Sequence, residues 1–228
     1  VKKKINQSLQ ILILVALPIT IGLSILATPV FNAFYGENIW GPTVFKYSVF
    51  IAIATCLFNT TIIILQSLNK YKTVFISIIS GIVIKYILNV PLMILTHNLG
   101  FQGFYGAITA TLIGIAVSVF INLYVLHKDE ELKVRYKQTL TTIIKVVYTL
   151  AIMCIVLLLM EFIIPIEGHG RMMSLLIVII YGIVGAGIYF GISIKNHMIR
   201  DVVGDKFIDN IFDKIKKILH IKRQNNSV

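Results

Sequence analysis

Long apolar runs, separated by short polar segments, account for most of the chain. Six of them reach the length of about 20 mostly apolar residues that a helix needs to cross a bilayer. They cover residues 8–31, 44–66, 73–96, 104–127, 139–164 and 172–195. The alternation of apolar and polar residues that marks the strands of a membrane barrel is missing. The pattern therefore predicts an all-α fold, a polytopic transmembrane helix bundle with six spanning helices.

The basic residues fall on one side of this predicted bundle. Seventeen of the 21 lysines and arginines lie in residues 1–7, 67–72, 128–138 and from 195 to the end. The alternate segments, 32–43, 97–103 and 165–171, contain only Arg171. Because lysine and arginine oppose translocation, short basic segments stay on the cytoplasmic side of a membrane. We therefore expect a multi-pass protein with both termini in the cytoplasm.

The composition supports a membrane protein. Hydrophobic residues make up 57% of the chain and charged residues 14%, and the mean hydropathy is +0.87. Soluble domains have roughly 45–50% apolar and about 25% charged residues, so membrane lipids are expected partners. The net charge of +11 does not indicate nucleic acid, because the basic residues are divided among short loops and form no basic face. No nucleic-acid partner is expected.

Residues 201–228 differ from the predicted transmembrane region, which covers residues 1–200. Within this tail, apolar residues recur at helical spacing over 205–221, with aspartates early and lysines late. That order complements a helix dipole. The apolar content suits a helix lying on the membrane surface, where lysines meet anionic lipid. We expect a basic amphipathic helix in the cytoplasm, and docking on a partner protein is the alternative.

Small residues recur at every fourth position of the fourth run, which places them on one face of a helix. They are Gly106, Ala110, Gly114, Ser118 and Asn122. Such faces let membrane helices approach closely, since hydrophobicity does not drive helices together within a bilayer. Gly187 and Gly191 in the sixth run have the same spacing and predict a second close contact.

Two runs contain an internal proline, Pro18 in the first and Pro91 in the third. Each proline removes one backbone hydrogen bond, and the freed carbonyl then needs a partner from a neighbouring helix or from water. One interpretation is a bend required for packing, and the other is a hinge in a moving transporter.

The residues that usually carry catalysis do not gather in the sequence. The five histidines are scattered over predicted helix ends, loops and the tail, and no carboxylate pair lies at membrane depth. Cys56 and Cys154 lie within apolar runs without CxxC spacing, so we interpret them as packing residues. We therefore expect no enzyme, no cofactor and no metal site.

Lys85 is the exception among the polar residues, because it lies midway along the third run. A charge at that depth costs about 2.5–3.5 kcal/mol on the insertion scale and usually faces a bundle interior or a watery cavity. Lys85 is therefore a candidate site for an anionic group such as a phosphate. Asn89, Asn59 and Gln66 are candidates to line the same cavity. The alternatives are a snorkelling lysine and amides that form interhelical hydrogen bonds.

Four stretches together resemble a known family. The first begins at residues 3–9, continues through Leu17-Pro18 and Gly22, and closes at 34–36; the others are 64–70, 84–92 and 103–111. In order and spacing they resemble the C-terminal part of polysaccharide-biosynthesis flippases of the MOP superfamily. The SpoVB/YtgP type, which is related to the MurJ lipid II flippases, is the most similar. The resemblance covers about residues 1–127.

The resemblance implies a function in the bacterial cell membrane. Such proteins have 12 to 14 helices in two lobes and move undecaprenyl-linked sugars across the membrane by alternating access. The chain resembles the last six helices of fourteen, which implies a fragment whose partners are a lipid-linked glycan substrate and a missing N-terminal lobe. Lys85 matches the lysine of the third stretch and would meet the phosphate of the head group or an inter-lobe contact. A MATE-type antiporter for drugs or cations and a non-transporting envelope scaffold are the alternatives.

Overall fold

The computed structural model describes residues 2–129, 137–166, 170–196 and 198–203, and these form only helices and their connections. The helices are α1 Lys2–Ile25, α2 Ala27–Tyr35, α3 Gly41–Ser67, α4 Tyr71–Asn98, α5 Gly103–Lys128, α6 Lys137–Glu161, α7 Arg171–Lys195 and α8 Met198–Val203. Six of them, α1 and α3 to α7, are long and apolar enough to cross a membrane. Within the described residues, the prediction of an all-helical bundle with six spanning helices is confirmed.

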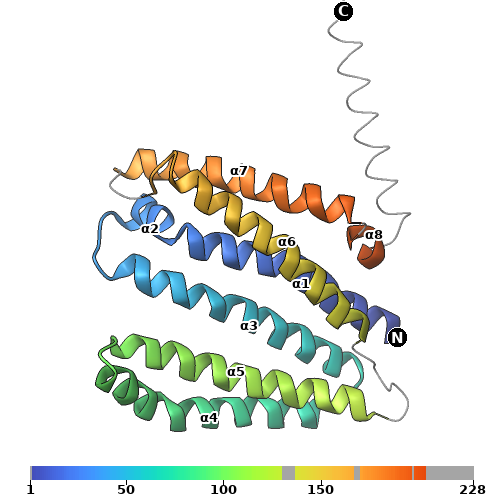
Figure 1. The fold of residues 1–228 in the computed structure, drawn as a ribbon. Helices are drawn as coiled ribbons and strands as arrows, with labels where there is room; N and C mark the ends of the chain where they lie inside the picture. Colours follow the sequence, from blue (N-terminus) through green and yellow to red (C-terminus); the bar gives the residue numbers. More distant parts are fainter. Residues whose placement is uncertain (1, 130–136, 167–169, 197, 204–228) are drawn as a thin grey trace, which may run out of the picture.

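The first apolar run is the one place where the predicted bounds are wrong. Instead of one helix over 8–31, the structure has α1 and then the separate helix α2, with a break at Leu26. Pro29 explains the break, because it has no N–H to donate to the Ile25 carbonyl and is tolerated only in the first turn of a helix. Figure 1 shows α2 turned out of the line of α1.

The long helices lie side by side and alternate in direction, as Figure 1 shows. α4 and α5 form one edge, α3 and α1 the middle, and α6 and α7 the other edge. We call the end where α1 begins the basic end, because Lys70, Lys72, Lys128 and Lys195 also lie there. The opposite end holds α2 and Arg171. This separation agrees with the sequence, and which end faces the cytoplasm stays a prediction.

Two apolar clusters hold the bundle together. The larger joins α1 to α6, α7 and α8 around Leu14, Leu157, Tyr181 and Tyr189. The smaller joins α1 to α3, α4 and α5 around Leu65. α4 is the least covered spanning helix, with 6% of its most apolar window buried in the structure. Its apolar face is therefore left to lipid or to another part of the protein.

The small-residue face of α5 packs against α4, as its spacing predicts. All five of its residues are buried, and α4 supplies Gly81 opposite Gly114 and Ser118. A Cβ at Gly114 would lie 2.7 Å from the Gly81 carbonyl oxygen, so neither position has room for a side chain. Ser118 Oγ donates to the Ser77 carbonyl at 2.7 Å, and an ion pair between Lys70 and Asp129 joins the same helices at the basic end.

The second predicted small-residue contact is wrong for the described residues. Gly187 and Gly191 are exposed, and nothing lies within 4 Å of a Cβ built at either position. The reason is their place in the fold, because α7 forms an edge of the bundle and this face of it has no neighbour.

The tail is described only at its start. Met198 and Val202 of α8 are buried in the larger cluster, and Gln7 Nε2 of α1 donates to the Val202 carbonyl at 3.0 Å. The expected boundary between residues 200 and 201 therefore falls within a helix that packs on the bundle. The amphipathic helix expected over 205–221 lies outside the described residues.

Candidate functional site

Lys85 lies near the middle of α4, where α4 passes α5 and approaches α3. Lys85 is exposed in this structure of the single chain, and it borders a pocket of about 140 Å³. The pocket is lined from α3 by Phe58, from α4 by Ile78, Gly81, Ile82 and Lys85, and from α5 by Thr111, Gly114, Ile115 and Ser118. The charge predicted for mid-membrane depth is therefore in a small recess shared by three helices.

A glycine fixes the position of Lys85. A Cβ at Gly114 would lie 2.9 Å from Lys85 Cβ, so only glycine lets the backbone at Lys85 come this close to α5. The long and flexible lysine side chain therefore starts from a backbone held by the α4–α5 contact. The ammonium group can change position by side-chain rotation, while the backbone and Cβ of Lys85 stay in place against α5.

No carboxylate lines this pocket. The described carboxylates of the spanning bundle lie at or beyond helix ends, at Glu37, Asp129 and Glu161. Within the described residues, the positive charge of Lys85 is thus not balanced by an acidic side chain. An ammonium group at this depth needs water or an anion to offset its desolvation, and this arrangement favours an anionic ligand.

The other predicted site residues are placed less favourably. Asn89 is half-buried one turn beyond Lys85 on α4, whereas Asn59 and Gln66 are exposed on α3, and none of the three lines this pocket. Sequence reasoning also missed Thr111, a hydroxyl group on the α5 wall of the pocket. Thr111 has no signal in one sequence, because it lies one position beyond the small-residue face that includes Ala110 and Gly114.

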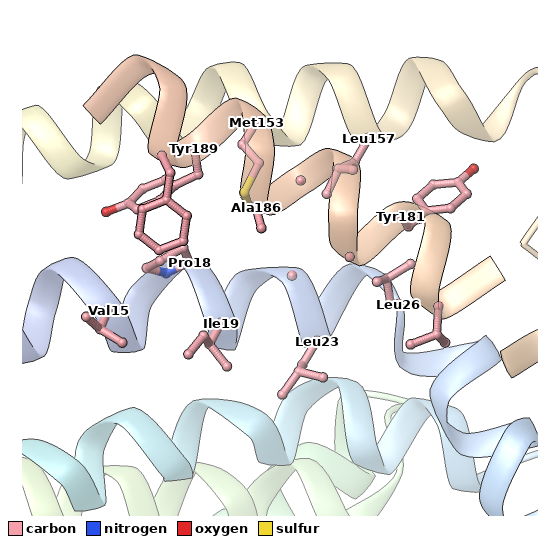
Figure 2. A pocket seen from close by; sticks show the side chains of 15 residues that line it. Val15, Pro18, Ile19, Leu23, Leu26, Met153, Leu157, Tyr181, Ala186 and Tyr189 are labelled. Carbon is pink, nitrogen blue, oxygen red and sulfur yellow. The ribbon is translucent and has the colours of Figure 1, made fainter. Parts of the chain in front are cut away.

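A second cavity lies between α1, α6 and α7 and is almost wholly apolar. Its volume is about 290 Å³, and Figure 2 shows its wall on α1 facing its wall on α6 and α7. The α1 wall includes Val15, Ile19 and Leu23, and the facing wall includes Met153 and Leu157. Gly22, Gly182 and Gly185 also line it, and their missing side chains account for part of its volume.

Two tyrosines line this cavity with their rings and use their hydroxyl groups elsewhere. Tyr181 donates to the Ile164 carbonyl at 2.7 Å, and Tyr189 donates to the Leu14 carbonyl at 2.8 Å. Leu14 is four residues before Pro18, so its carbonyl is the one that the proline leaves without a helical donor. The neighbouring helix expected to satisfy this carbonyl is therefore α7, and the cavity keeps an apolar surface.

These features define a class. The chain is a multi-pass membrane protein, with six helices of spanning length. A lysine lies midway along α4 and an apolar cavity lies between α1, α6 and α7, and both are features by which a membrane protein can bind a ligand.

Comparison with known proteins gives a relative in the same class. The chain is 28% identical over 209 residues to the lipid II flippase MurJ of Bacillus subtilis (strain 168). The match covers 89% of this chain, and the chain spans 37% of the length of that relative. The chain is thus a distant homologue of a MurJ flippase, which supports the MOP-type flippase family. No family model matches the chain, and no solved structure matches it.

Proposed function

We propose that the chain is the C-terminal portion of a flippase that moves lipid-linked cell-envelope glycan precursors across the bacterial cell membrane. Lipid II and undecaprenyl-linked polysaccharide units are the candidate substrates, and the SpoVB/YtgP type is the candidate subfamily. The observation that carries the proposal is the 28% identity to a lipid II flippase over 89% of the chain. An N-terminal lobe is the proposed partner, because the chain spans 37% of that relative.

The two cavities support this proposal through their contrasting chemistry. Lys85 provides one positive charge with no carboxylate around its pocket, which suits the phosphate of a lipid-linked sugar. Asn89, Asn59 and Gln66 are proposed to meet the same head group from α4 and α3 once the N-terminal lobe encloses it. The apolar cavity between α1, α6 and α7 suits hydrocarbon, because its tyrosine hydroxyl groups are occupied elsewhere.

A flipping assay tests the role of Lys85. The full-length protein that contains this chain is reconstituted in vesicles, and the transfer of a fluorescent lipid-linked disaccharide is followed in the wild type and in Lys85→Ala. Losing a charge-assisted hydrogen bond of about 1.5–3 kcal/mol predicts a rate at least roughly tenfold lower. Lys72→Ala is the matched control, because Lys72 is exposed at the start of the same helix.

The outcomes separate the parts of the proposal. Equal rates for Lys85→Ala and the wild type would reject Lys85 as a substrate-binding residue. No transfer by the wild type, with the protein correctly folded, would reject the flippase. A MATE-type antiporter gains no support, because carboxylates that would bind a cation are absent from the interior of the described spanning helices. The scaffold alternative gains no observation from the structure.

A further inference from the structure

A polar hollow lies at the end of the bundle opposite the basic end, and none of its lining residues belongs to the Lys85 pocket. It has a volume of about 490 Å³ and is formed by α2, the loop after it and the first turn of α3. Five of its seven lining residues are polar: Thr28, Asn32, Glu37, Asn38 and Thr43. A pocket of roughly 300–1,000 Å³ is the usual size of a small-molecule site.

Asn32 is the residue that marks this hollow as more than a surface irregularity. Its side chain is 8% exposed, and its buried Oδ1 has no hydrogen-bond partner in the structure. A buried polar atom without a partner costs about 1–3 kcal/mol. Rotation of the Asn32 amide toward the hollow that it lines would bring this oxygen to a donor group of a ligand and recover that cost. Thr28 lies one turn earlier on the same face of α2 and also lines the hollow.

The loop that closes the hollow is held in shape by Asn38. Its Oδ1 accepts hydrogen bonds from the backbone N–H groups of Trp40, at 2.9 Å, and Gly41, at 2.8 Å. These two bonds close a turn that fixes the loop just before α3, whose N-cap is Trp40. The groups left to meet a ligand are the Glu37 carboxylate, the Asn32 amide and the hydroxyl groups of Thr28 and Thr43.

We infer that this hollow binds a neutral, polyhydroxylated ligand, the sugar part of a glycan head group. Amide, carboxylate and hydroxyl groups together accept and donate hydrogen bonds in the way that vicinal hydroxyl groups need. No basic side chain lines the hollow, so it does not suit a phosphate. The inference rests on the proposed function and assigns to it a second place for the head group, at the end of the bundle opposite the basic end.

A metal ion fits this hollow less well than a sugar. Calcium takes 6–8 oxygen ligands close around it, whereas the hollow is large and has a single carboxylate, Glu37. No group of three or more His, Cys, Asp or Glu side chains that could hold a metal occurs in the described part of the chain. A cation is therefore the competing outcome of the test.

Trp40 makes the test specific, because it is the single tryptophan of the chain and follows the lining residue Ile39. The full-length protein in lipid nanodiscs is titrated with the disaccharide of N-acetylglucosamine. Tryptophan fluorescence is recorded against a Trp40→Phe background, and binding of the tritiated disaccharide is measured directly. Calcium chloride is titrated in parallel.

Three variants test whether the disaccharide binds in this hollow. Thr28→Val/Thr43→Val keeps the shape but removes two hydroxyl groups, and should raise the dissociation constant for the disaccharide at least roughly tenfold. Glu37→Gln keeps a hydrogen-bonding group and should change it less than about threefold. Thr109→Val is the control, because Thr109 is an exposed threonine of α5 that does not line the hollow.

The outcomes distinguish the site from the proposed function. Absent binding of the tritiated disaccharide would overturn the inference, and so would a calcium response that Glu37→Gln abolishes while the disaccharide gives none. Binding that the double valine variant weakens and Thr109→Val leaves unchanged would support it. Binding in a protein that transfers no lipid-linked sugar would support the site and overturn the flippase.

Discussion

The contact between α4 and α5 and the contact between α1 and α7 solve the same problem in opposite ways. In the first, glycines and serines let the backbones meet, and Ser118 reaches the Ser77 carbonyl directly. In the second, the hydroxyl group at the end of the long Tyr189 side chain donates to the Leu14 carbonyl, and the apolar cavity lies beside this side chain. Both contacts join a hydroxyl group to the backbone of the next helix, and the length of the side chain sets the distance between the helices.

The difference shows how a membrane bundle closes the gap between two helices on one side and keeps a cavity on the other. Because a bilayer does not drive apolar surfaces together, a gap between two membrane helices does not have to close. Small residues close the gap between α4 and α5, and the two backbones come close enough for Ser118 to reach the Ser77 carbonyl. Tyr189 bridges α7 and α1 with a long side chain, and that side carries the cavity of about 290 Å³. Each prediction below tests one side against the other.

The largest effect is expected at the close contact. In Gly106→Ala the new methyl group would collide with the backbone of Leu92 and Met93 on α4, which cannot rotate away. We expect the two helices to be forced apart at a cost of about 1–3 kcal/mol. The midpoint of unfolding in mixed micelles of increasing SDS content measures the change.

Gly182→Ala on α7 is the matched control for this substitution. Nothing lies within 4 Å of a Cβ at Gly182, so the same methyl group has open space there. Alanine is also a better helix former than glycine by about 1 kcal/mol. Equal destabilisation by the two variants would show that the close contact on α5 is not the reason.

The next effect is expected at Tyr189, on the cavity side. Tyr189→Phe leaves the Leu14 carbonyl without a partner, since Pro18 supplies no N–H to it. Leaving a buried acceptor unpaired costs about 1–3 kcal/mol. Tyr181→Phe is the comparison, because its acceptor, the Ile164 carbonyl, lies beyond the end of α6.

Water reaches a loop more easily than mid-helix backbone, so Tyr181→Phe should cost less. Unfolding of both variants in mixed micelles gives the two values. Adding Pro18→Ala to Tyr189→Phe restores a helical donor for the Leu14 carbonyl and should recover most of the loss. A double variant as unstable as Tyr189→Phe would contradict the role assigned to the tyrosine.

The apolar cavity itself predicts a smaller effect, on transport rather than on folding. Gly182→Leu places a side chain in the cavity without a backbone collision. If a lipid chain occupies this space, the flipping rate should fall about tenfold, corresponding to about 1.4 kcal/mol. Gly187→Leu is the control, because Gly187 is exposed on the same helix but does not line the cavity. A fall of equal size in both variants would exclude the cavity as a lipid site.

The sequence predicts the contact between α4 and α5 better than it predicts the cavity beside α1 and α7. The spacing of Gly106, Ala110 and Gly114 predicts the close contact, because a single helix face carries the whole signal. The spanning helices follow from apolar length in the same way. The cavity has no such signal, because Tyr189 and Leu14 are 175 residues apart and meet only when α7 packs on α1. The break at Leu26 also has no signal in apolar length, because Pro29 interrupts the backbone hydrogen bonds without interrupting the apolar run.

The smallest effect is expected at the hydrogen bond from Asn122 Nδ2 to Thr61 Oγ1, which joins α5 to α3 at 3.0 Å. Both side chains are fully buried, yet Asn122 Oδ1 has no hydrogen-bond partner. Interhelical hydrogen bonds in membranes contribute about 0.6 kcal/mol on average. A double-mutant cycle with Asn122→Ala and Thr61→Ala, followed by SDS unfolding, should give a coupling of about that size.

The unpaired Asn122 Oδ1 also makes the loss of stability in Asn122→Ala small. Asn122→Ala removes one favourable hydrogen bond and one unsatisfied acceptor together, so the two changes partly cancel. Asn122→Asp keeps the size but buries a carboxylate beside the Thr61 hydroxyl, which already donates to the Phe58 carbonyl at 2.8 Å. It should be the more destabilising of the two. If Asn122→Ala is the worse variant, the buried oxygen has a partner, and the polar contacts of this side extend further than α3, α4 and α5.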